Sequence, residues 1–546
     1  MDWPLLDRRA LLGGLGLAGG AMMLGAPGRG QAAELSGEDI TLIIAQGSLP
    51  IDGHHARAIT INGAVPAPTL RLRQGQRLRL TVINQLDEES SLHWHGLVLP
   101  FQMDGVPGVS FPGIAPRGRF TYDFTITQTG TYWYHSHSGL QELMGAYGAI
   151  VIDPADAPLA MRDHVLLLSD HSFVHPARIL ANLKRSPGYY NRQPQTLADL
   201  AAGRGQGIGE RLQWAQMRMD PTDIADVTGA VLRYLVNGHG PADTWTALFT
   251  PGETMRLRFI NAGGMTFFNV RIPGLPMTVV AADGQLVQPV TIDEFQIAPG
   301  ETYDVLVTPP QPSAYTVAAE TMDRSGMARA TLASAQGMSA PVPPLRPRPL
   351  LTMRDMGMDM PGHSMQGMSM RDGRLAPQVA MGPGVEMINP MPIDRTGDPG
   401  LGLEAVGHRV LRYRDLIAAA PNPDTRAAER EVEVHLTGAM DRYMWSIDGK
   451  TMQEAHEPLP MRTGERVRIT LINDTMMAHP IHLHGHIFEL VTGHGAYSPR
   501  KHTVTVLPGG RVSFDVTAEP GDWAFHCHLF LHMAMGMMRI VQVRPV

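Results

Sequence analysis

The sequence has only one cysteine and few aromatic residues. Cys527 is the single cysteine among 546 residues, so no disulfide can form within the chain. Aromatic residues make up 6% of the total and charged residues 18%. The formal net charge of −7 gives no indication of nucleic-acid binding. Beyond the first thirty or so residues, no apolar run is long enough to span a membrane.

What the sequence does contain is glycine and proline, with 58 and 44 residues respectively. This content is high for a helical protein and suits short strands joined by turns. The length exceeds what one hydrophobic core can organise, and it favours about three domains.

The N-terminus has the features of an export signal, assigned to residues 1–33. Arg8 and Arg9 precede an apolar, glycine-rich stretch, and a small-x-small site follows at 30–32. The paired arginines favour the twin-arginine route, and an ordinary signal peptide is the alternative. We therefore expect a periplasmic protein whose signal is removed.

Two sequence patterns each occur three times. The first has a glycine turn, alternating charged and apolar residues and a closing asparagine, which is typical of a strand with one buried face. The second follows each copy of the first and also predicts a strand after a turn. The copies are 75–84, 252–261 and 464–473 for the first pattern, and 118–123, 300–304 and 510–515 for the second.

Three copies of an all-β unit predict three Greek-key sandwich domains. We place them at 36–155, 160–345 and 396–546. Residues 176–228 lack the strand pattern and are expected to form a partly helical insertion in the middle domain. Residues 346–395, rich in Pro, Gly and Met, are expected to be a mobile linker.

Histidine pairs occur at matching positions of the first and third copies. Counting nine and eleven residues from the closing asparagine gives His93 and His95, and His482 and His484. The same positions of the middle copy hold no histidine. Residues two apart on a strand point to the same face, so each pair can present two imidazoles to one place.

A second matched position gives two more pairs. His135 and His137 follow a glycine and an aromatic run, and so do His526 and His528. Eight imidazoles that converge from two domains predict a site for several metal ions, whereas a lone buried histidine is usually a hydrogen-bonded core residue. Imidazole alone suits copper, zinc or iron.

The remaining ligands favour copper. Cys527 must face away from its two histidine neighbours, and His479 must face away from His482 on an extended strand. His532 and Met537 lie five and ten residues beyond the cysteine. Two histidines, a thiolate and a distant methionine are typical of a blue-copper electron-transfer site.

These motifs resemble those of three-domain multicopper oxidases, and the resemblance covers the whole mature chain. It implies cupredoxin-like domains, four copper ions and reduction of dioxygen to water. It further implies a type 1 copper held by His479, Cys527, His532 and Met537, a type 2 copper held by His93 and His482, and two type 3 coppers held by His95, His135 and His528 and by His137, His484 and His526.

Asp104 resembles the family's acid beside the type 2 site, where it would relay protons; the alternative is a turn residue before Gly105. Some relatives carry a second acid directly after the last type 1 histidine, but here that position is Met533.

The leader, the Met-rich linker and residues 218–229 resemble bacterial copper-resistance oxidases, which oxidise Cu(I) to Cu(II). Thioether sulfur selects Cu(I), so the linker is a candidate copper-gathering segment; a plain tether is the alternative. Its candidate ligands are Met353, Met356, Met358, Met360, His363, Met365, Met368 and Met370.

Two other functions remain open. One is a laccase-like oxidase of phenols or aromatic amines, and the other is a protein that sequesters copper by binding alone. In each case we expect no nucleic-acid partner and a monomer, and the oxidases would use dioxygen.

Overall fold

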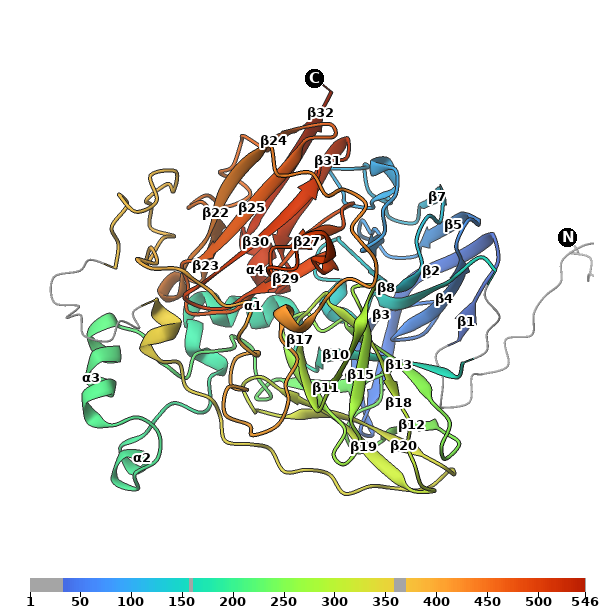
Figure 1. The fold of residues 1–546 in the computed structure, drawn as a ribbon, viewed down its shortest axis with the longest axis horizontal. Helices are drawn as coiled ribbons and strands as arrows, with labels where there is room; N and C mark the ends of the chain where they lie inside the picture. Colours follow the sequence, from blue (N-terminus) through green and yellow to red (C-terminus); the bar gives the residue numbers. More distant parts are fainter. Residues whose placement is uncertain (1–32, 157–160, 358–369, 546) are drawn as a thin grey trace, which may run out of the picture. The chain divides into compact units, whose positions relative to one another are not determined.

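The computed structural model describes residues 33–156, 161–357 and 370–545. The predicted export signal therefore lies outside the described residues, apart from its last position. Five candidate copper-gathering residues of the linker also lie outside them: Met358, Met360, His363, Met365 and Met368. The prediction of an all-β fold is confirmed, with three successive pairs of sheets (Figure 1).

The first pair of sheets, here called the first sandwich, has the strand orders β1-β4-β9-β8-β6 and β3-β2-β5-β7. Apolar residues of both sheets, such as Leu42, Leu80 and Ile150, share one core. The elements are β1 Glu34–Leu35, β2 Asp39–Ile51, β3 His54–Ile61, β4 Ala67–Arg73, β5 Arg77–Asn84, β6 His93–His95, η1 Phe101–Met103, β7 Arg119–Thr125, β8 Gly130–His135, η2 Glu142–Met144 and β9 Tyr147–Asp153.

The middle sandwich has the orders β11-β10-β13-β18-β15-β16 and β12-β20-β19-β14-β17. Helices occupy the segment between β10 and β11, where the sequence lacks the strand pattern. The elements are β10 Asp163–Ser172, α1 Pro176–Arg185, η3 Pro187–Tyr190, α2 Leu197–Ala201, α3 Ile208–Met217, β11 Leu232–Val236, β12 Trp245–Leu248, β13 Met255–Asn261, β14 Phe268–Arg271, β15 Met277–Ala282, β16 Gln285–Ile292, β17 Glu294–Ile297, β18 Thr302–Val307, β19 Ala314–Thr321 and β20 Met327–Ala333.

The third sandwich has the orders β23-β22-β25-β30-β27-β28, with β21 also paired to β30, and β24-β32-β31-β26-β29. Its elements, with the preceding η4, are η4 Met353–Met356, β21 Ile393–Asp394, η5 Tyr413–Asp415, β22 Arg430–Ala439, η6 Met440–Arg442, β23 Met444–Ile447, β24 Leu459–Arg462, β25 Arg466–Asn473, β26 His479–Leu483, β27 Phe488–Leu490, η7 Gly495–Tyr497, β28 Arg500–Lys501, β29 Thr503–Val506, β30 Gly510–Thr517, β31 Gly521–Cys527, α4 Phe530–Ala534 and β32 Met538–Arg544.

The repeated sequence patterns form equivalent strands in the three sandwiches. The first pattern gives β5, β13 and β25, and each pairs in parallel with an earlier strand and antiparallel with β7, β18 or β30 of the second pattern. The closing asparagines Asn84, Asn261 and Asn473 are buried. Each accepts the backbone N–H two residues ahead at 2.9 Å, an Asx-turn that ends the strand. The sequence repeat is therefore a structural repeat.

The first residues of the predicted linker, in the part that the structure describes, are packed against the rest of the protein. Met356 is fully buried in η4. Asp355 in the same turn accepts from Arg395 Nη1 at 2.7 Å, and both side chains are buried. The methionine-rich composition did not indicate these buried contacts, because thioether side chains fill irregular gaps in a core as readily as they bind metal.

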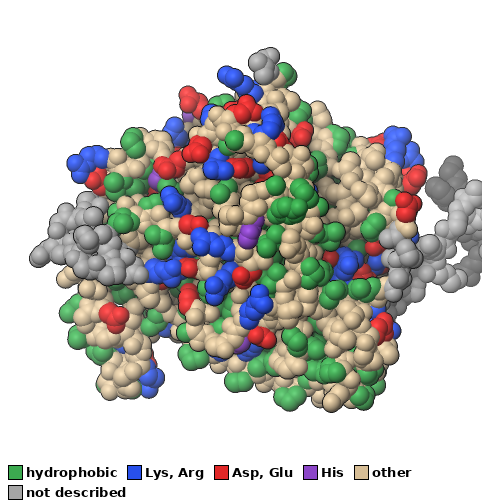
Figure 2. Space-filling model, viewed as in Figure 1, with side chains coloured by type: hydrophobic (Ala, Val, Ile, Leu, Met, Phe, Trp, Pro, Cys, Tyr) green, Lys and Arg blue, Asp and Glu red, His purple; other side chains and the backbone are tan. Residues whose placement is uncertain are grey.

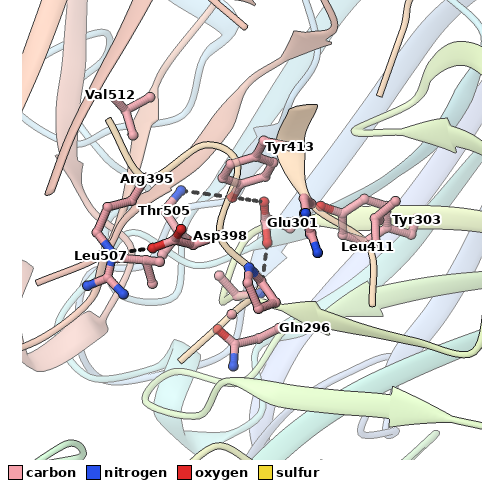
Figure 3. A pocket seen from close by; sticks show the side chains of 14 residues that line it. Gln296, Glu301, Tyr303, Arg395, Asp398, Leu411, Tyr413, Thr505, Leu507 and Val512 are labelled. Atoms are coloured by element: carbon pink, nitrogen blue, oxygen red, sulfur yellow. Dashed lines mark hydrogen bonds and ion pairs between the residues drawn. The ribbon is translucent and has the colours of Figure 1, made fainter. Parts of the chain in front are cut away.

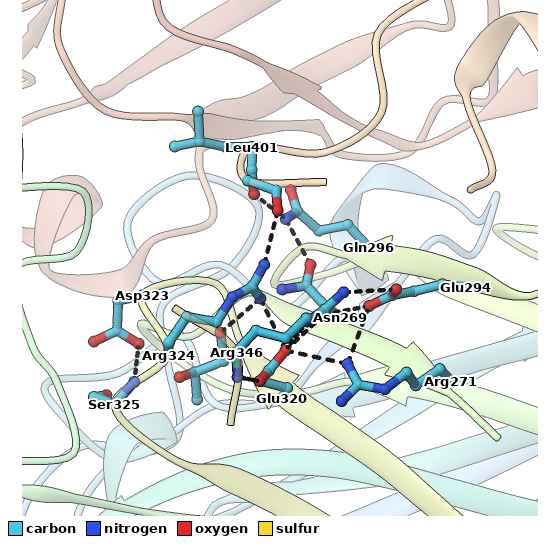
Figure 4. Close-up of polar contacts among 12 residues, drawn as sticks. Asn269, Arg271, Glu294, Gln296, Glu320, Asp323, Arg324, Ser325, Arg346 and Leu401 are labelled. Carbon is cyan, nitrogen blue, oxygen red and sulfur yellow. Dashed lines mark hydrogen bonds and ion pairs between the residues drawn. The ribbon is translucent and has the colours of Figure 1, made fainter. Parts of the chain in front are cut away.

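A cluster of buried ion pairs joins the end of the middle sandwich to the chain that follows it (Figure 4). Arg346 donates to Glu320 at 2.6 Å and to Glu294 at 2.9 Å, and both carboxylates are fully buried. Arg271 contacts both acids, and Arg324 contacts Glu320. Removing one partner from such a cluster leaves a buried charge uncompensated.

Replacing Arg346 with alanine is therefore expected to destabilise the protein by about 3 kcal/mol. Thermal unfolding of the metal-free protein, followed by circular dichroism, measures the loss. The matched control is Arg374→Ala, because the Arg374 side chain is 91% exposed and its solvent-screened pair with Asp372 should contribute little to stability. Equal unfolding temperatures for the two variants would contradict this account of the cluster.

The surface carries charges of both signs. On the face drawn in Figure 2, acidic and basic side chains lie interspersed among apolar and neutral ones. Within the described residues, no helix has the length and apolar character needed to cross a bilayer.

Candidate metal centre

The first sandwich positions its two histidine pairs on neighbouring strands. β6 and β8 are antiparallel, with His93 directly opposite His135. His137 lies just beyond the end of β8, and its backbone N–H donates to Ser91 Oγ at 3.1 Å. All four imidazoles are therefore held at one end of one sheet.

The third sandwich repeats this arrangement with β26 and β31. Here His482 lies opposite His526, and Ile481 lies opposite Cys527. In the middle sandwich the equivalent strands β14 and β19 bring together Val270 and Ala319. The same strand pairing thus carries histidines in two sandwiches and apolar core residues in the third.

The two histidine clusters meet face to face. The rings of His93 and His484 stack with centroids 3.8 Å apart, as do those of His95 and His482. The rings of His137 and His526 have centroids 5.3 Å apart. Four pairs predicted from spacing alone therefore converge on one place between the first and third sandwiches.

Ring nitrogens gather in sets that follow the predicted ligand groups. Nitrogens of His95, His135 and His528, one predicted type 3 set, lie within 4.8 Å of one another. The predicted type 2 pair, His93 and His482, forms a similar group together with His95.

The other predicted type 3 set is less tightly grouped. His137 and His484 group with His93 rather than with His526. His526 still belongs to the cluster, because its Nε2 lies 3.0 Å from Nε2 of His484.

Hydrogen bonds fix which nitrogen each imidazole offers. Five rings place Nδ1 against an oxygen: His93, His135, His482, His484 and His526. An oxygen of a carbonyl or carboxylate can only accept, so these rings carry the proton on Nδ1 and present Nε2 as a lone pair. His95 has the opposite arrangement of its two nitrogens. Its Nε2 lies 3.2 Å from Thr503 Oγ1, and its Nδ1 has no hydrogen-bond partner.

Seven buried ring nitrogens of the cluster have no hydrogen-bond partner. These are Nε2 of His93, His135, His137 and His482, Nδ1 of His95 and both ring nitrogens of His528. Burial lowers the pKa of His95, His135, His137, His482, His484 and His528 well below its ordinary value, and that of His526 to about 3. Neutral, unpaired imidazoles are what a cluster of metal ions requires.

A second, smaller group lies on the other side of β31. Cys527 Sγ is 3.5 Å from His479 Nδ1 and 3.9 Å from His532 Nδ1, and the two nitrogens are 3.2 Å apart. Met537, the fourth predicted ligand, is also buried, and its carbonyl accepts the Cys527 N–H at 3.1 Å. Burial raises the pKa of the Cys527 thiol, so a cation has to replace its proton for the thiolate to form. Two imidazoles and a thiol suit copper.

Neighbouring side chains orient this second group. His479 Nε2 lies 2.7 Å from Thr475 Oγ1, and His532 Nε2 donates to Asp226 Oδ2 at 2.6 Å. Trp445 stacks on His532 with ring centroids 3.8 Å apart. As a result, both histidines direct Nδ1 at the sulfur, and both are fully buried.

Two carboxylates contact the larger histidine cluster. Asp104 accepts from His484 Nδ1 at 2.8 Å and its Oδ1 lies 3.3 Å from His93 Nδ1, one ring of the predicted type 2 pair. Glu142 lies 2.6 Å from His135 Nδ1, and its other oxygen is buried without a partner. One acid thus contacts His484 and His93, and the other contacts His135.

Sequence reasoning missed Glu142, Asp226, Thr475 and Thr503. Asp226 lies in residues 218–229, which were singled out by resemblance without a role for the carboxylate. No spacing rule links Glu142 to the histidines, because η2 has to fold back before its side chain meets His135.

Comparison with known proteins identifies the family. Three multicopper oxidase family models match residues 44–157, 209–337 and 425–546. Copper resistance protein A of Escherichia coli is 46% identical, across 98% of this chain and 99% of that protein. A copper resistance protein A homolog of Pseudomonas syringae pv. tomato is also 46% identical, across 98% of each.

Among solved structures, a multi-copper oxidase from Pseudomonas thermotolerans has the same fold, with a TM-score of 0.60 at 22% identity. The alignment covers 94% of this chain and 100% of the chain in that structure. The full-length identity to two copper resistance proteins and the three matched family models place this chain in the multicopper oxidase family, and it is an oxidoreductase.

Proposed function

We propose that this chain is a copper-resistance oxidase that oxidises Cu(I) to Cu(II) and passes the electrons to dioxygen, which becomes water. The names of its 46% identical relatives support this function. Export to the periplasm with removal of residues 1–33, and action as a monomer, are further parts of the proposal.

The proposal includes four copper ions. His479, Cys527, His532 and Met537 would hold the type 1 ion, and the eight convergent imidazoles would hold the other three, grouped as the family resemblance implies. Bound copper supplies one-electron redox chemistry at the cysteine site and dioxygen reduction at the imidazole cluster.

The chain's own residues have three tasks in this reaction. Cys527 is bonded through the backbone to His526 and His528, so the two sites are joined by a short covalent connection. Asp104 holds the Nδ1 proton of His484 and is placed to pass protons toward the cluster. The buried walls keep bulk water and other reductants from the imidazoles.

The observation that carries the choice of Cu(I) is a small cavity beside the cysteine site. Three methionines line it together with Asp226 and Asp323: Met265, Met322 and Met477. Its volume is about 10 Å³, enough for one small ion or water but not for an aromatic ring. Thioethers select Cu(I). Asp226, which lines the cavity, also accepts a hydrogen bond from His532 Nε2 at 2.6 Å.

A laccase-like oxidation of phenols is less well supported. His479 and His532 are fully buried, and Asp226, Tyr443 and Trp445 surround His532. An aromatic substrate would therefore have to donate its electron across these side chains, whereas a cation in the cavity would lie against a carboxylate that touches the ligand.

Replacing Asp226 with asparagine tests this function. The amide can still accept from His532 but carries no charge, so kcat/KM for Cu(I) is expected to fall about tenfold, or ~1.4 kcal/mol. Oxidation of an electron-rich phenol should stay within about twofold. Steady-state oxygen consumption with each substrate measures both.

The matched control is Asp220→Asn, in the same segment but outside the cavity lining. An unchanged kcat/KM for Cu(I) in Asp226→Asn would refute the assigned entry site. Equal losses for Cu(I) and phenol would mean that Asp226 only tunes the type 1 ligand.

A copper-gathering role for the linker methionines stays part of the proposal. In the described residues, Met356 is buried and Met353 and Met370 are partly buried against the hydrophobic core. These three would therefore act as anchors more readily than as exposed ligands.

A further inference from the structure

A buried lysine lies where the middle and third sandwiches meet. Lys501, at the end of β28, is fully buried. Its Nζ lies 3.1 Å from Asp283 Oδ2 and 3.2 Å from Glu301 Oε1, two buried acids of the middle sandwich. Burial alone would lower the pKa of Lys501, but the two carboxylates outweigh burial and raise it. The ammonium group therefore stays charged and holds both acids.

The cluster ends at a small cavity. Tyr413 donates to Glu301 Oε1 at 2.6 Å and accepts the Thr505 N–H at 3.0 Å. Figure 3 shows Tyr413 and Glu301 pointing toward each other in the lining of this cavity, which has a volume of about 50 Å³. The Tyr413 contact on this side ties the segment before β22 to Glu301.

Asp283 also holds the backbone on the other side of Lys501. Its Oδ2 accepts the N–H of His502 at 3.2 Å and the N–H of Thr503 at 3.1 Å. Its Oδ1 accepts the N–H of Thr302 at 3.0 Å within the middle sandwich. One carboxylate therefore fixes residues 501–503 by a side-chain ion pair and two backbone hydrogen bonds.

Residues 502 and 503 in turn hold two predicted copper ligands. The carbonyl of His502 accepts from His482 Nδ1 at 2.7 Å. Thr503 Oγ1 lies 3.2 Å from His95 Nε2 and 3.3 Å from His482 Nδ1. His95 belongs to the first sandwich and His482 to the third, so this short segment sets the orientation of ligands from both.

We propose that Asp283 is a positioning residue through which the middle sandwich, which has no histidine at the motif positions, shapes the type 2 copper site at His482 and orients the neighbouring type 3 ligand His95. The carboxylate fixes the His502 carbonyl and the Thr503 hydroxyl, and these two groups fix the ring orientation and protonated nitrogen of His482 and His95. Partners one step behind a metal ligand commonly change metal affinity ten- to hundredfold. The inference rests on the ligand roles of His95 and His482 but not on Cu(I) as the substrate.

The test is copper retention in Asp283→Asn. The copper-loaded variant and the wild type are dialysed against a graded series of chelator concentrations, and total copper, the blue absorption and the type 2 spin-resonance signal are measured. We expect the type 2 signal to be lost at roughly tenfold lower chelator concentration than in the wild type, the lower end of the range for direct partners of a ligand, because Asp283 acts through residues 502 and 503. The blue absorption should be unchanged, because Asp283 makes no contact with the cysteine site.

The matched control is Asp304→Asn. Asp304 is another buried acid of the middle sandwich that reaches a neighbouring sandwich, accepting from Thr131 Oγ1 at 2.6 Å, but it contacts no predicted ligand. This variant should keep both signals. Thermal unfolding of each metal-free variant shows whether a loss of copper instead reflects a lower stability of the folded protein.

A second variant, Thr503→Val, removes the hydroxyl while the two backbone hydrogen bonds to Asp283 remain, and it should also weaken type 2 retention. Retention like that of the wild type in both Asp283→Asn and Thr503→Val would overturn the proposal. Parallel loss of type 1 and type 2 copper, or an equal loss in Asp304→Asn, would overturn it as well, because either result indicates general loosening.

Discussion

Replacement of Cys527 with serine is expected to abolish oxidation of both Cu(I) and phenols and to remove the blue absorption. The hydroxyl does not supply the soft thiolate that His479 and His532 face at 3.5 and 3.9 Å. Without a thiolate to bind the copper, the covalent connection through the backbone to His526 and His528 no longer begins at the metal. Absorption spectra, copper counting and oxygen consumption measure the three consequences.

The imidazole cluster serves as the internal control for this variant. Six of its eight histidines have ring hydrogen bonds, and none of these uses the cysteine sulfur. The variant should therefore keep about three of four coppers, with the paired type 3 ions spin-silent. If cells that carry this variant resisted copper as well as the wild type, sequestration would be the better explanation of function.

Asp104→Asn is expected to reduce turnover by roughly 10²–10⁴-fold, the range in which a positioned acid–base group contributes. The amide oxygen can still accept from His484 Nδ1, so the cluster should keep its copper. What the variant loses is a buried group that can give up and regain a proton between His93 and His484.

Two half-reactions separate this effect from a structural one. Bleaching of the blue band by Cu(I) without oxygen should proceed at the wild-type rate, and recovery of the band on mixing with oxygen should be slow. Slow bleaching would place the defect at the electron-entry site, contrary to the role proposed for Asp104. Full recovery at the wild-type rate would make Asp104 a turn residue, as the alternative interpretation holds.

The repeat explains why so much of the metal centre could be predicted from sequence. The alternating pattern and its closing asparagine place β5, β13 and β25 at equivalent positions. Once the strands are equivalent, histidines at equal distances from the asparagine must occupy equivalent places. Neighbouring residues on a strand face opposite ways, which separates Cys527 from His526 and His528.

The supporting groups could not be predicted in this way. Asp226 reaches His532 from a segment between helix and strand about 300 residues away in sequence, and its position depends on how the insertion folds. From sequence alone, Lys501 would be expected at the surface, because lysine is rarely buried. The alternating pattern of a strand carries no information about its contacts with another domain. The linker shows the same limit, since composition predicts mobility but Met356 packs in the core.

The middle sandwich shows what this scaffold is like without a metal. It keeps the strand pairing, the asparagine turn and a core, while Val270 and Ala319 occupy the places that histidines take elsewhere. The strand pairing and core of such a sandwich therefore form without any ligand for an ion. The histidines of the first and third sandwiches are side chains placed on a scaffold whose middle copy does without them.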